Sequence, residues 1–148
     1  MKALVQRVQQ ASVKVEHQTV GEINQGIAIL LGIRNSDTEK DIDYIVNKIL
    51  NIRIFPGQHS HFDQSVTEIK GDLLVVSQFT LHADIKKGRR PSFSDAAKSD
   101  AAKNLFDKTI LLLEKSDLKI ETGTFGADML VEIHNDGPVT LMIDSKTN

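Results

Sequence analysis

The segment Ile27–Ile33 reads IAILLGI and is the longest apolar run in the chain. An apolar run without polar alternation is typical of a strand that is buried on both faces. The run is far shorter than the ~20 residues that a membrane-spanning helix requires. We therefore expect Ile27–Ile33 to form a central strand of a sheet, and we expect no membrane partner.

Two helices are predicted, one on each side of a second buried strand, Leu73–Phe79 (LLVVSQF). Apolar residues at positions 42, 45, 46 and 49 follow a group of capping candidates at helical spacing, which predicts a helix over Thr38–Leu50. The second helix is expected to begin near Ser94-Asp95 and to end by Lys115.

The remaining elements are predicted to be short strands. They are Leu4–Val8, Ser12–Glu16, Ile52–Phe55, Lys119–Thr124, Met129–Asn135 and Val139–Asp144, with tight turns at Gly21 and Gly26. This order predicts an α/β fold, a single domain over residues 1–148 whose mixed β-sheet is curled toward a barrel with two helices packed on it. A Rossmann fold is not expected, because no G-x-G-x-x-G motif follows a strand, and a P-loop is absent too.

Composition narrows the functional classes. The 148 residues carry 18 basic and 20 acidic side chains, and this net charge of −2 excludes a globally basic nucleic-acid coat protein but not a local basic patch. The chain has no cysteine, so disulfide scaffolds, thiolate zinc sites and cysteine nucleophiles are excluded. Met1–Val15 lacks the apolar core of a signal peptide, and we expect a soluble, cytoplasmic protein.

The sequence Ser77-Gln78-Phe79-Thr80 stands at the end of the second buried strand, where open α/β sheets usually bind ligands. Its hydroxyl and amide groups are typical of a functional site, but equally of a strand end that satisfies the backbone of the adjoining loop. A nucleophilic Thr80 would need an adjacent base. His82 shares a face with Thr80 only if the strand continues. Both interpretations stay open on these residues alone.

The sequence Asn135-Asp136-Gly137-Pro138 links two predicted strands. Its Asp-Gly pair is typical of a hairpin turn. The Gly-Pro pair favours a second interpretation, because an X–Pro bond can be cis at a cost of only ~0.5–1 kcal/mol and glycine permits a backbone path closed to other residues. A rigid turn of this kind would present carbonyl oxygens to an ammonium group without using a side chain.

Two further loops carry residue types that occur in binding sites. The segment Lys86–Arg90 (KKGRR) places four cations in a predicted loop, and it is either a solvated loop or a phosphate contact for a nucleic-acid end. The segment His59–Asp63 (HSHFD) holds two histidines and an acid, but no third ligand follows at metal-site spacing. We therefore interpret His59–Asp63 as a surface loop and expect neither a metal site nor a cofactor.

Five segments together resemble one enzyme family. They are VQRVQQASV (Val5–Val13), SQFTL (Ser77–Leu81), KKGRRPSF (Lys86–Phe93), FGADM (Phe125–Met129) and NDGPVT (Asn135–Thr140). With these segments the whole chain resembles the D-aminoacyl-tRNA deacylases. The resemblance implies a homodimer with its active sites at the subunit interface. It also implies hydrolysis of the ester that joins a D-amino acid to the 3′-terminal ribose of tRNA, with release of free tRNA.

The resemblance further implies roles for individual residues. Gly137 and Pro138 resemble a Gly-cisPro element that reaches into the partner subunit's site, holds the α-ammonium group of the substrate and excludes an L side chain. Achiral glycine would then be accepted, so glycyl-tRNA mischarged on tRNA(Ala) is an expected substrate. The implied catalytic residues are Ser77, Gln78, Phe79 and Thr80, and those implied to bind the tRNA 3′ end are Arg7, Lys86, Lys87, Arg89, Arg90, Phe125 and Met129.

Two mechanisms are compatible with the resemblance. Thr80 is the nucleophile in one, whereas in the other the terminal ribose 2′-OH assists and backbone N–H groups near Phe79 stabilise the oxyanion. We favour the second, because no residue is a clear base for Thr80. The chain departs from the family pattern at 61–64, where HFDQ replaces a common Met-Asn pair, and at His82, where a Tyr is common. Both positions are expected at the rim of the site.

Two hypotheses from other functional classes compete with this one. The first is a non-catalytic module that binds the tRNA 3′ end through the Lys86–Arg90 loop. The second is a small-molecule esterase with a threonine nucleophile. Neither explains why a Gly-Pro turn accompanies the SQFT segment, so we expect the deacylase.

Overall fold

The structure, a computed structural model, describes residues 1–86 and 88–146. Its strands are β1 (Lys2–Val15), β2 (Gln18–Ile23), β3 (Gly26–Gly32), β4 (Arg53–Phe55), β5 (Gln64–Ser65), β6 (Asp72–Ser77), β7 (Ile120–Thr122) and β8 (Leu130–Asp144). The α-helices are α1 (Glu39–Asn51) and α2 (Ser99–Leu113), and the short 3-10 helices are η1 (Phe79–His82) and η2 (Glu114–Ser116). Neither α1 nor α2, the α-helices of the described residues, is long and apolar enough to cross a membrane.

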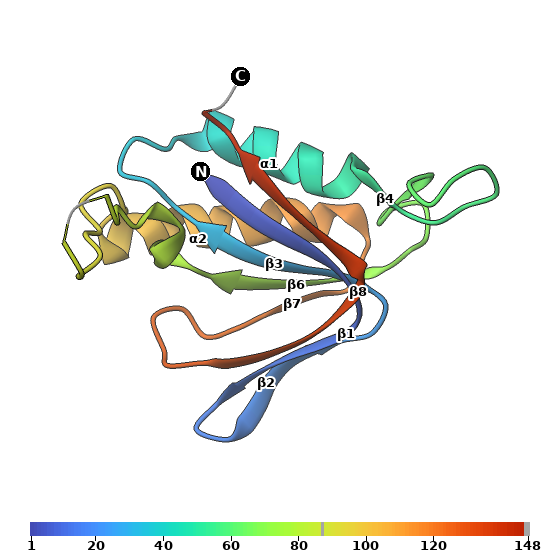
Figure 1. The fold of residues 1–148 in the computed structure, drawn as a ribbon, viewed down its shortest axis with the longest axis horizontal. Coiled ribbons are helices and arrows are strands. Elements are labelled where there is room, and N and C mark those ends of the chain that lie inside the picture. The colour runs from blue at the N-terminus through green and yellow to red at the C-terminus, as the bar shows by residue number, and fades with distance from the viewer. Residues whose placement is uncertain (87, 147–148) are drawn as a thin grey trace.

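The main sheet is built around β1. Its strands run in the order β2-β1-β3-β6-β7, and β8 pairs with β1 as well. The first half of β1 pairs with β3 and the second half with β2, while β8 follows it through both halves (Figure 1). The β3–β6 and β6–β7 pairs are parallel, and the other pairs of this sheet are antiparallel. The predicted α/β fold is confirmed, since a mixed sheet nearly closed into a barrel carries two helices.

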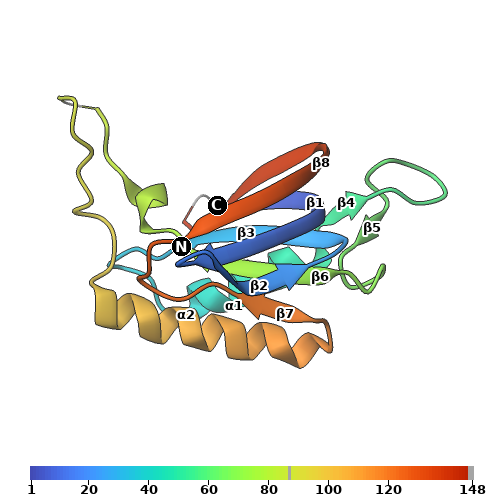
Figure 2. The same cartoon turned by 90° about the horizontal axis from the view of Figure 1, so that it is seen from below.

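Both α-helices pack on the same face of this sheet (Figure 2). The predicted start of α1 is confirmed, because the Asp41 carboxylate accepts hydrogen bonds from the Thr38 backbone N–H at 2.8 Å and the Thr38 hydroxyl at 3.0 Å. The apolar stripe of α1 is buried, as are Phe106 and Leu113 of α2. One apolar cluster fills the space between the helices and the sheet, and a second fills the inside of the curled sheet around Val13 and Leu74.

The N-terminal strands differ from the prediction of two short strands. Residues 2–15 form the single strand β1. The exposed Gln9 and Gln10 interrupt the apolar pattern, and the register with β8 shifts between Val8 and Gln10, but β8 pairs with β1 on both sides of this irregularity. The turn that follows is made by Glu16 and His17, and Gly21 lies inside β2. A Cβ on Gly21 would lie 2.7 Å from the Thr122 carbonyl oxygen, so close packing of strands explains this glycine better than a turn does.

Two further boundaries differ from the prediction. The strand predicted to reach Phe79 ends at Ser77, and η1 begins at Phe79. The second helix begins at Ser99 rather than near Ser94. Ser94 and Asp95 form a turn instead, and backbone hydrogen bonds tie this segment to the end of β3, from Asn35 N–H to the Asp95 carbonyl at 3.0 Å and from Ala97 N–H to the Ile33 carbonyl at 2.9 Å. These tertiary contacts override the local capping signal.

Candidate active site

The Ser77–Thr80 segment marks the point where β6 stops. The Gln78 N–H donates to the Leu31 carbonyl at 2.8 Å, and the chain then turns into η1. Within η1 the Leu81 N–H donates to the Gln78 carbonyl at 3.3 Å. The first N–H groups of a helix have no intrahelical acceptor, so those of Phe79 and Thr80 are available to a ligand.

A cavity of about 310 Å³ opens beside this segment. It is lined by Leu31, Ile33, Ser77, Gln78, Phe79, Ala97, Ser99, Ala102, Phe125 and Gly126. The lining is apolar apart from the Ser77–Gln78 end and Ser99, which suits a flat organic group held against a polar reaction centre. Phe125 was predicted at the site from the sequence, but Ala97 and Ala102 were not, because only the fold brings the start of α2 and the residues before it beside the end of β3.

The environment of Thr80 does not provide a base. Its hydroxyl accepts a hydrogen bond from the side-chain amide of Gln78. His82 does not continue a strand with Thr80, since it lies in η1 with its side chain buried and bonded to the backbone of Gly32. Burial lowers the pKa of His82, and the nearby charges of Arg34 and Lys2 lower it further, against the Gly32 hydrogen bond. Among the described residues, no carboxylate or imidazole bonds to Thr80.

The Asn135–Pro138 segment is not a hairpin turn. The residues before and after it belong to the same strand, β8, and pair with the same partner, β1. Val8 pairs with Asn135 and Gln6 pairs with Thr140. Between these two pairs β8 advances by five residues, whereas β1 advances by only two. The extra residues form a bulge, with Gly137 and Pro138 exposed at its tip.

The base of this bulge is held by one side chain. The Asn135 amide nitrogen donates to the carbonyls of Arg7 at 2.9 Å and Val139 at 3.0 Å. Its amide oxygen accepts from the hydroxyl of Thr140 at 3.0 Å and from the amide of Gln6 at 3.3 Å. Asn135 thus satisfies the backbone groups that the bulge leaves without strand partners.

Arg7 supports the tip of the bulge. Its Nε lies 2.8 Å from Asp136 Oδ2, and its Nη1 donates to the Ile54 carbonyl at 2.7 Å. Gly137 has φ of +113°, and a Cβ there would lie 2.9 Å from Arg7 Nη2, so both backbone conformation and space require glycine. The Gly137–Pro138 peptide bond is cis. The largely buried Arg7 therefore fixes the shape of the bulge and does not line the cavity.

Within one chain the bulge and the cavity lie at opposite ends of the sheet. Val8, beside the bulge, pairs with Gly26 at the start of β3, whereas Ser77 pairs with Leu31 near its end. Five residues of strand correspond to about 16 Å at about 3.3 Å per residue. The two motifs cannot contact the same small substrate within one copy of the chain.

The cationic loop lies beyond η1. Lys86, Arg89 and Arg90 are exposed, and Lys87 lies outside the described residues. The rings of Phe79 and Phe93 meet edge to face with centroids 4.9 Å apart, and both are exposed. Exposed aromatic rings next to cations are typical of surfaces that bind single-stranded nucleic acid. Phe93 belongs to a family-like segment of the sequence, but its residue type alone predicted no role for it.

Other predicted positions lie elsewhere. Met129 packs against the apolar cluster inside the curled sheet and does not line the 310 Å³ cavity. His59 and His61 are exposed, and no group of three or more metal-ligating side chains occurs within residues 1–86 and 88–146. The segment His59–Asp63 is a surface loop, as expected.

Comparison with known proteins decides the family. The model of the family described as D-Tyr-tRNA(Tyr) deacylase matches residues 4–144. This chain belongs to that family. It is 53% identical over 148 residues to the D-aminoacyl-tRNA deacylase of Clostridium botulinum (strain Alaska E43 / Type E3), covering 100% of this chain and 99% of the relative. The deacylase of Aquifex aeolicus (strain VF5) is also 53% identical, over 146 residues and 99% of both chains.

Two solved structures resemble this member of the deacylase family. The c-Myc DNA Unwinding Element Binding Protein superposes with a TM-score of 0.92 at 41% identity, covering 97% of this chain and 98% of that one. A probable eukaryotic D-amino acid tRNA deacylase superposes with a TM-score of 0.84 at 19% identity, over 96% of this chain and 97% of that one. At 19% identity, the second superposition shows a shared fold alone.

Proposed function

We propose that this chain hydrolyses the ester between a D-amino acid and the 3′-terminal ribose of tRNA, releasing free tRNA and the D-amino acid. The observation that carries this proposal is the pair of N–H groups at Phe79 and Thr80 beside an apolar cavity of about 310 Å³. A nucleoside placed in the cavity would bring its ester to these donors. Family membership supplies the substrate class.

The proposed chemistry uses the backbone rather than a protein nucleophile. Water attacks the ester carbonyl, and the N–H groups of Phe79 and Thr80 stabilise the negative charge on the carbonyl oxygen. The 2′-OH of the terminal ribose assists proton transfer to the departing 3′ oxygen. Thr80 is not the nucleophile, because Gln78 is the side chain bonded to its hydroxyl and His82 is turned to Gly32.

Chiral selection is assigned to Gly137 and Pro138 of the partner subunit. In D and L substrates the side chain and the α-hydrogen exchange places, so a rigid backbone wall admits one and clashes with the other. Carbonyl oxygens of this element hold the α-ammonium group. Glycine has no side chain to exclude, so glycyl-tRNA mischarged on tRNA(Ala) is a second substrate.

A homodimer is therefore part of the proposal. One copy cannot bring its own bulge to its own cavity, since about 16 Å of strand separates them. Among the described strands β8 pairs only with β1, so its second edge is open, and Leu130, Leu141 and Met142 of β8 are exposed. An open strand edge with exposed apolar side chains is typical of a surface that a second copy covers.

The tRNA end is assigned to the exposed surface beside η1. Lys86, Lys87, Arg89 and Arg90 would contact phosphates, which position a nucleic acid without reading the amino acid. Phe79 and Phe93 would stack on unpaired bases of the 3′ end. Charged tRNA is a cytoplasmic substrate, so the proposal keeps the expected cytoplasmic localisation.

The direct test compares one tRNA charged with the D and the L form of the same amino acid. The purified chain should release the D-amino acid catalytically and leave the L ester at its spontaneous rate of hydrolysis. Equal release of both forms would contradict the chiral selection. Release of neither would contradict the enzyme itself.

The exposed cations Lys86, Arg89 and Arg90 also fit a protein that only binds a nucleic-acid end, and one similar solved structure is the c-Myc DNA Unwinding Element Binding Protein. Such a module would shield the ester and slow its spontaneous hydrolysis. The same assay separates the two functions, because an enzyme and a shield change the rate of D-ester loss in opposite directions.

A further inference from the structure

The short helix η1 lies directly against the end of β3, at Gly32. A Cβ added to Gly32 would lie 2.9 Å from the Gln78 carbonyl oxygen. It would also lie 3.0 Å from Leu81 Cβ and 3.2 Å from His82 Cδ2. These atoms belong to the residue before η1 and to η1 itself. Because Gly32 has no side chain, the backbone of β3 supports η1 by direct contact.

His82, the last residue of η1, is bonded to the same glycine. Its ring donates a hydrogen bond to the Gly32 backbone, and only 5% of the residue is exposed. The ring nitrogen Nε2 is buried and has no hydrogen-bond partner within residues 1–86 and 88–146. A neutral imidazole carries a single N–H, so the proton that binds Gly32 is assigned to Nδ1. This nitrogen ties the end of η1 to β3.

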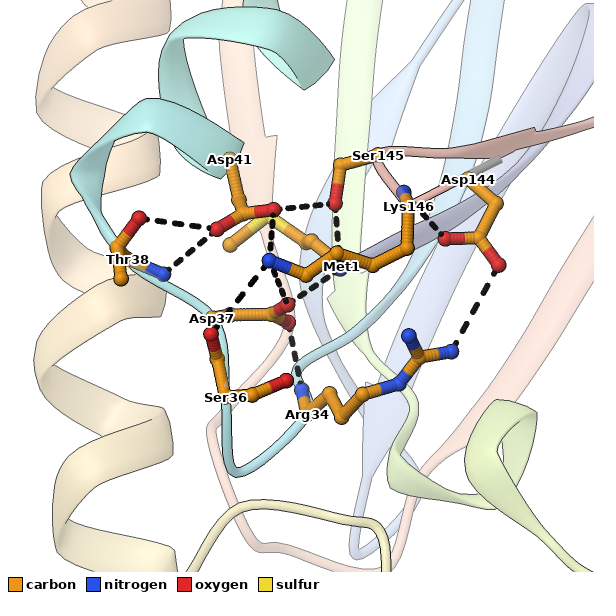
Figure 3. A network of polar contacts seen from close by, with 9 residues as sticks. All are labelled: Met1, Arg34, Ser36, Asp37, Thr38, Asp41, Asp144, Ser145 and Lys146. Atoms are coloured by element: carbon orange, nitrogen blue, oxygen red, sulfur yellow. Dashed lines mark hydrogen bonds and ion pairs between the residues drawn. The ribbon is translucent and has the colours of Figure 1, made fainter. Parts of the chain in front are cut away.

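Two cations lie near the ring of His82. The Lys2 ammonium donates to the Leu81 carbonyl at 3.3 Å, which adds a bond between β1 and η1. The guanidinium of Arg34 is held by β8, with Nη2 3.7 Å from Asp144 Oδ2 (Figure 3). Burial lowers the pKa of His82, and the charges of Arg34 and Lys2 lower it further, against the hydrogen bond to the β3 backbone. The ring is therefore neutral near pH 7 and keeps one fixed donor.

The placement of η1 decides where the donors of the candidate site point. Phe79 and Thr80 are the first two residues of η1, and their N–H groups have no acceptor within that helix. A helix of four residues is too short to keep its conformation without tertiary contacts. A shift of His82 at the end of η1 would therefore also move Phe79 and Thr80 at its start.

We propose that His82 is a positioning residue of the deacylase site, whose ring holds η1 on Gly32 and thereby keeps the N–H groups of η1 aimed at the ester. This inference rests on the proposed function, because that function assigns the Phe79 and Thr80 N–H groups to the oxyanion. His82 does not touch the substrate, since it is buried on the side of η1 that faces β3. It acts through η1 and takes no part in proton transfer.

Two substitutions separate the hydrogen bond of the ring from its bulk. His82→Asn keeps an amide donor where the imidazole carries Nδ1, whereas His82→Leu keeps a similar volume without a donor. His82→Leu should lower kcat for D-aminoacyl-tRNA about 10–10²-fold, the cost of a small displacement at a positioning element. KM should change less than about twofold, because the cavity and the cationic loop are unaltered. His82→Asn should keep most of the parent kcat.

An equal loss of kcat in both variants would overturn the proposal, because the hydrogen bond would then not matter. So would a parent-like kcat in His82→Leu, or a loss that falls mainly on KM. A parent chain that releases no D-amino acid would instead contradict the proposed function. The positioning role of His82 would then be decided by measurements that need no substrate.

Amide hydrogen exchange reports on η1 in this way. The N–H groups of Leu81 and Ala83 close the turns of η1 with hydrogen bonds of 3.3 Å and 3.0 Å. Both should exchange at least about tenfold faster in His82→Leu than in His82→Asn, because η1 opens locally when its support is lost. The buried Ile45 of α1 reports overall stability and should show no such difference. Equal rates at Leu81 and Ala83 in the two variants would contradict the role of the ring.

A third measurement needs no substitution and covers the case in which His82→Leu does not fold. Nitrogen-15 NMR of the ring nitrogens distinguishes the two neutral tautomers of a histidine from its protonated form. At about pH 7, the His82 ring of the parent chain should carry its proton on Nδ1 alone. A proton on Nε2 alone would remove the hydrogen bond to Gly32, and protons on both nitrogens would contradict a neutral ring. Either result would overturn the proposal.

Discussion

The two motifs of the candidate site differ in how the fold holds them. At Ser77–Thr80 a strand ends, and the available groups are backbone N–H donors beside a cavity. At Asn135–Thr140 a strand continues through a bulge whose polar groups are bound by Asn135 and Arg7. The first region offers unsatisfied donors, whereas the second offers a fixed shape. We infer that chemistry belongs to the first region and selection to the second.

The largest effect is expected from removing a donor in the first region. Phe79→Pro deletes one backbone N–H, and proline is tolerated at the first position of a helix. Loss of one oxyanion donor should lower kcat about 10²–10³-fold. The control Phe79→Ala loses the ring but keeps the N–H, and it should act mainly on KM. If both variants lose activity equally, the ring and not the donor is responsible.

Gly137→Ala should have the next largest effect, through the shape of the second region. The new Cβ would lie 2.9 Å from both Arg7 Nη2 and Val139 Cγ2, at a φ that L residues rarely adopt. A displacement of about 1 Å at a positioning element can cost about 10²-fold in rate. D-aminoacyl-tRNA turnover should fall by that order, and the exposed His134→Ala in the same strand should be unaffected. Full activity of Gly137→Ala would show that the shape of the bulge does not determine the selection of D substrates.

Thr80→Ala tests whether the first region uses a side chain after all. Because the backbone and the ribose are proposed to carry the reaction, deacylation should fall by less than about 10²-fold, the lower end of a proton-transfer contribution. Single-turnover rates with D-aminoacyl-tRNA give this number directly. A loss beyond about 10⁴-fold in a folded variant would identify Thr80 as the nucleophile.

Neutralising Lys86, Lys87, Arg89 and Arg90 together should act on binding only. For every phosphate that the variant no longer binds, the slope of log K against log salt should fall by about 0.7–0.9. KM for tRNA should rise, while kcat and the preference for D over L stay as they were, because phosphate contacts do not read the amino acid. An unchanged salt slope would identify the loop as merely solvated.

The smallest effect concerns the support of η1 by His82. Its pKa is lowered in the folded chain, so below about pH 6.5 the unfolded chain binds a proton that the folded chain does not. The free energy of unfolding should therefore decrease as the pH falls from 7 toward 5. His82→Gln should flatten this dependence in denaturant titrations. An unchanged pH dependence of the unfolding free energy in His82→Gln would show that other titratable groups cause it.

Elements specified by local patterns were predictable from the sequence. The apolar run within β3 and the capped, periodic helix α1 need no information from elsewhere in the chain. The bulge was not predictable as such. Its Asp136-Gly137 pair carries the signal of a hairpin, and only the pairing of both halves of β8 with β1 shows otherwise.

The residues of the candidate site also divide into those that local sequence patterns predict and those that only the fold brings together. Residue types at the end of one predicted strand and in the link between two others point to the SQFT segment and the Gly-Pro pair as candidate site residues. The cavity wall from Ala97 and Ala102 was not predictable in this way, because small apolar residues carry no signal until α2 is packed beside β3.

The central claim is that one active site takes its donors from one copy and its selecting bulge from the other. The most direct test of this claim uses two variants of very low activity, Phe79→Pro and Gly137→Ala. Equal amounts of the two variants are unfolded, mixed and refolded together. Random pairing makes half of the dimers mixed, each with one intact site, so about a quarter of the parent activity should return. No recovery in mixed dimers whose formation is verified would contradict the account.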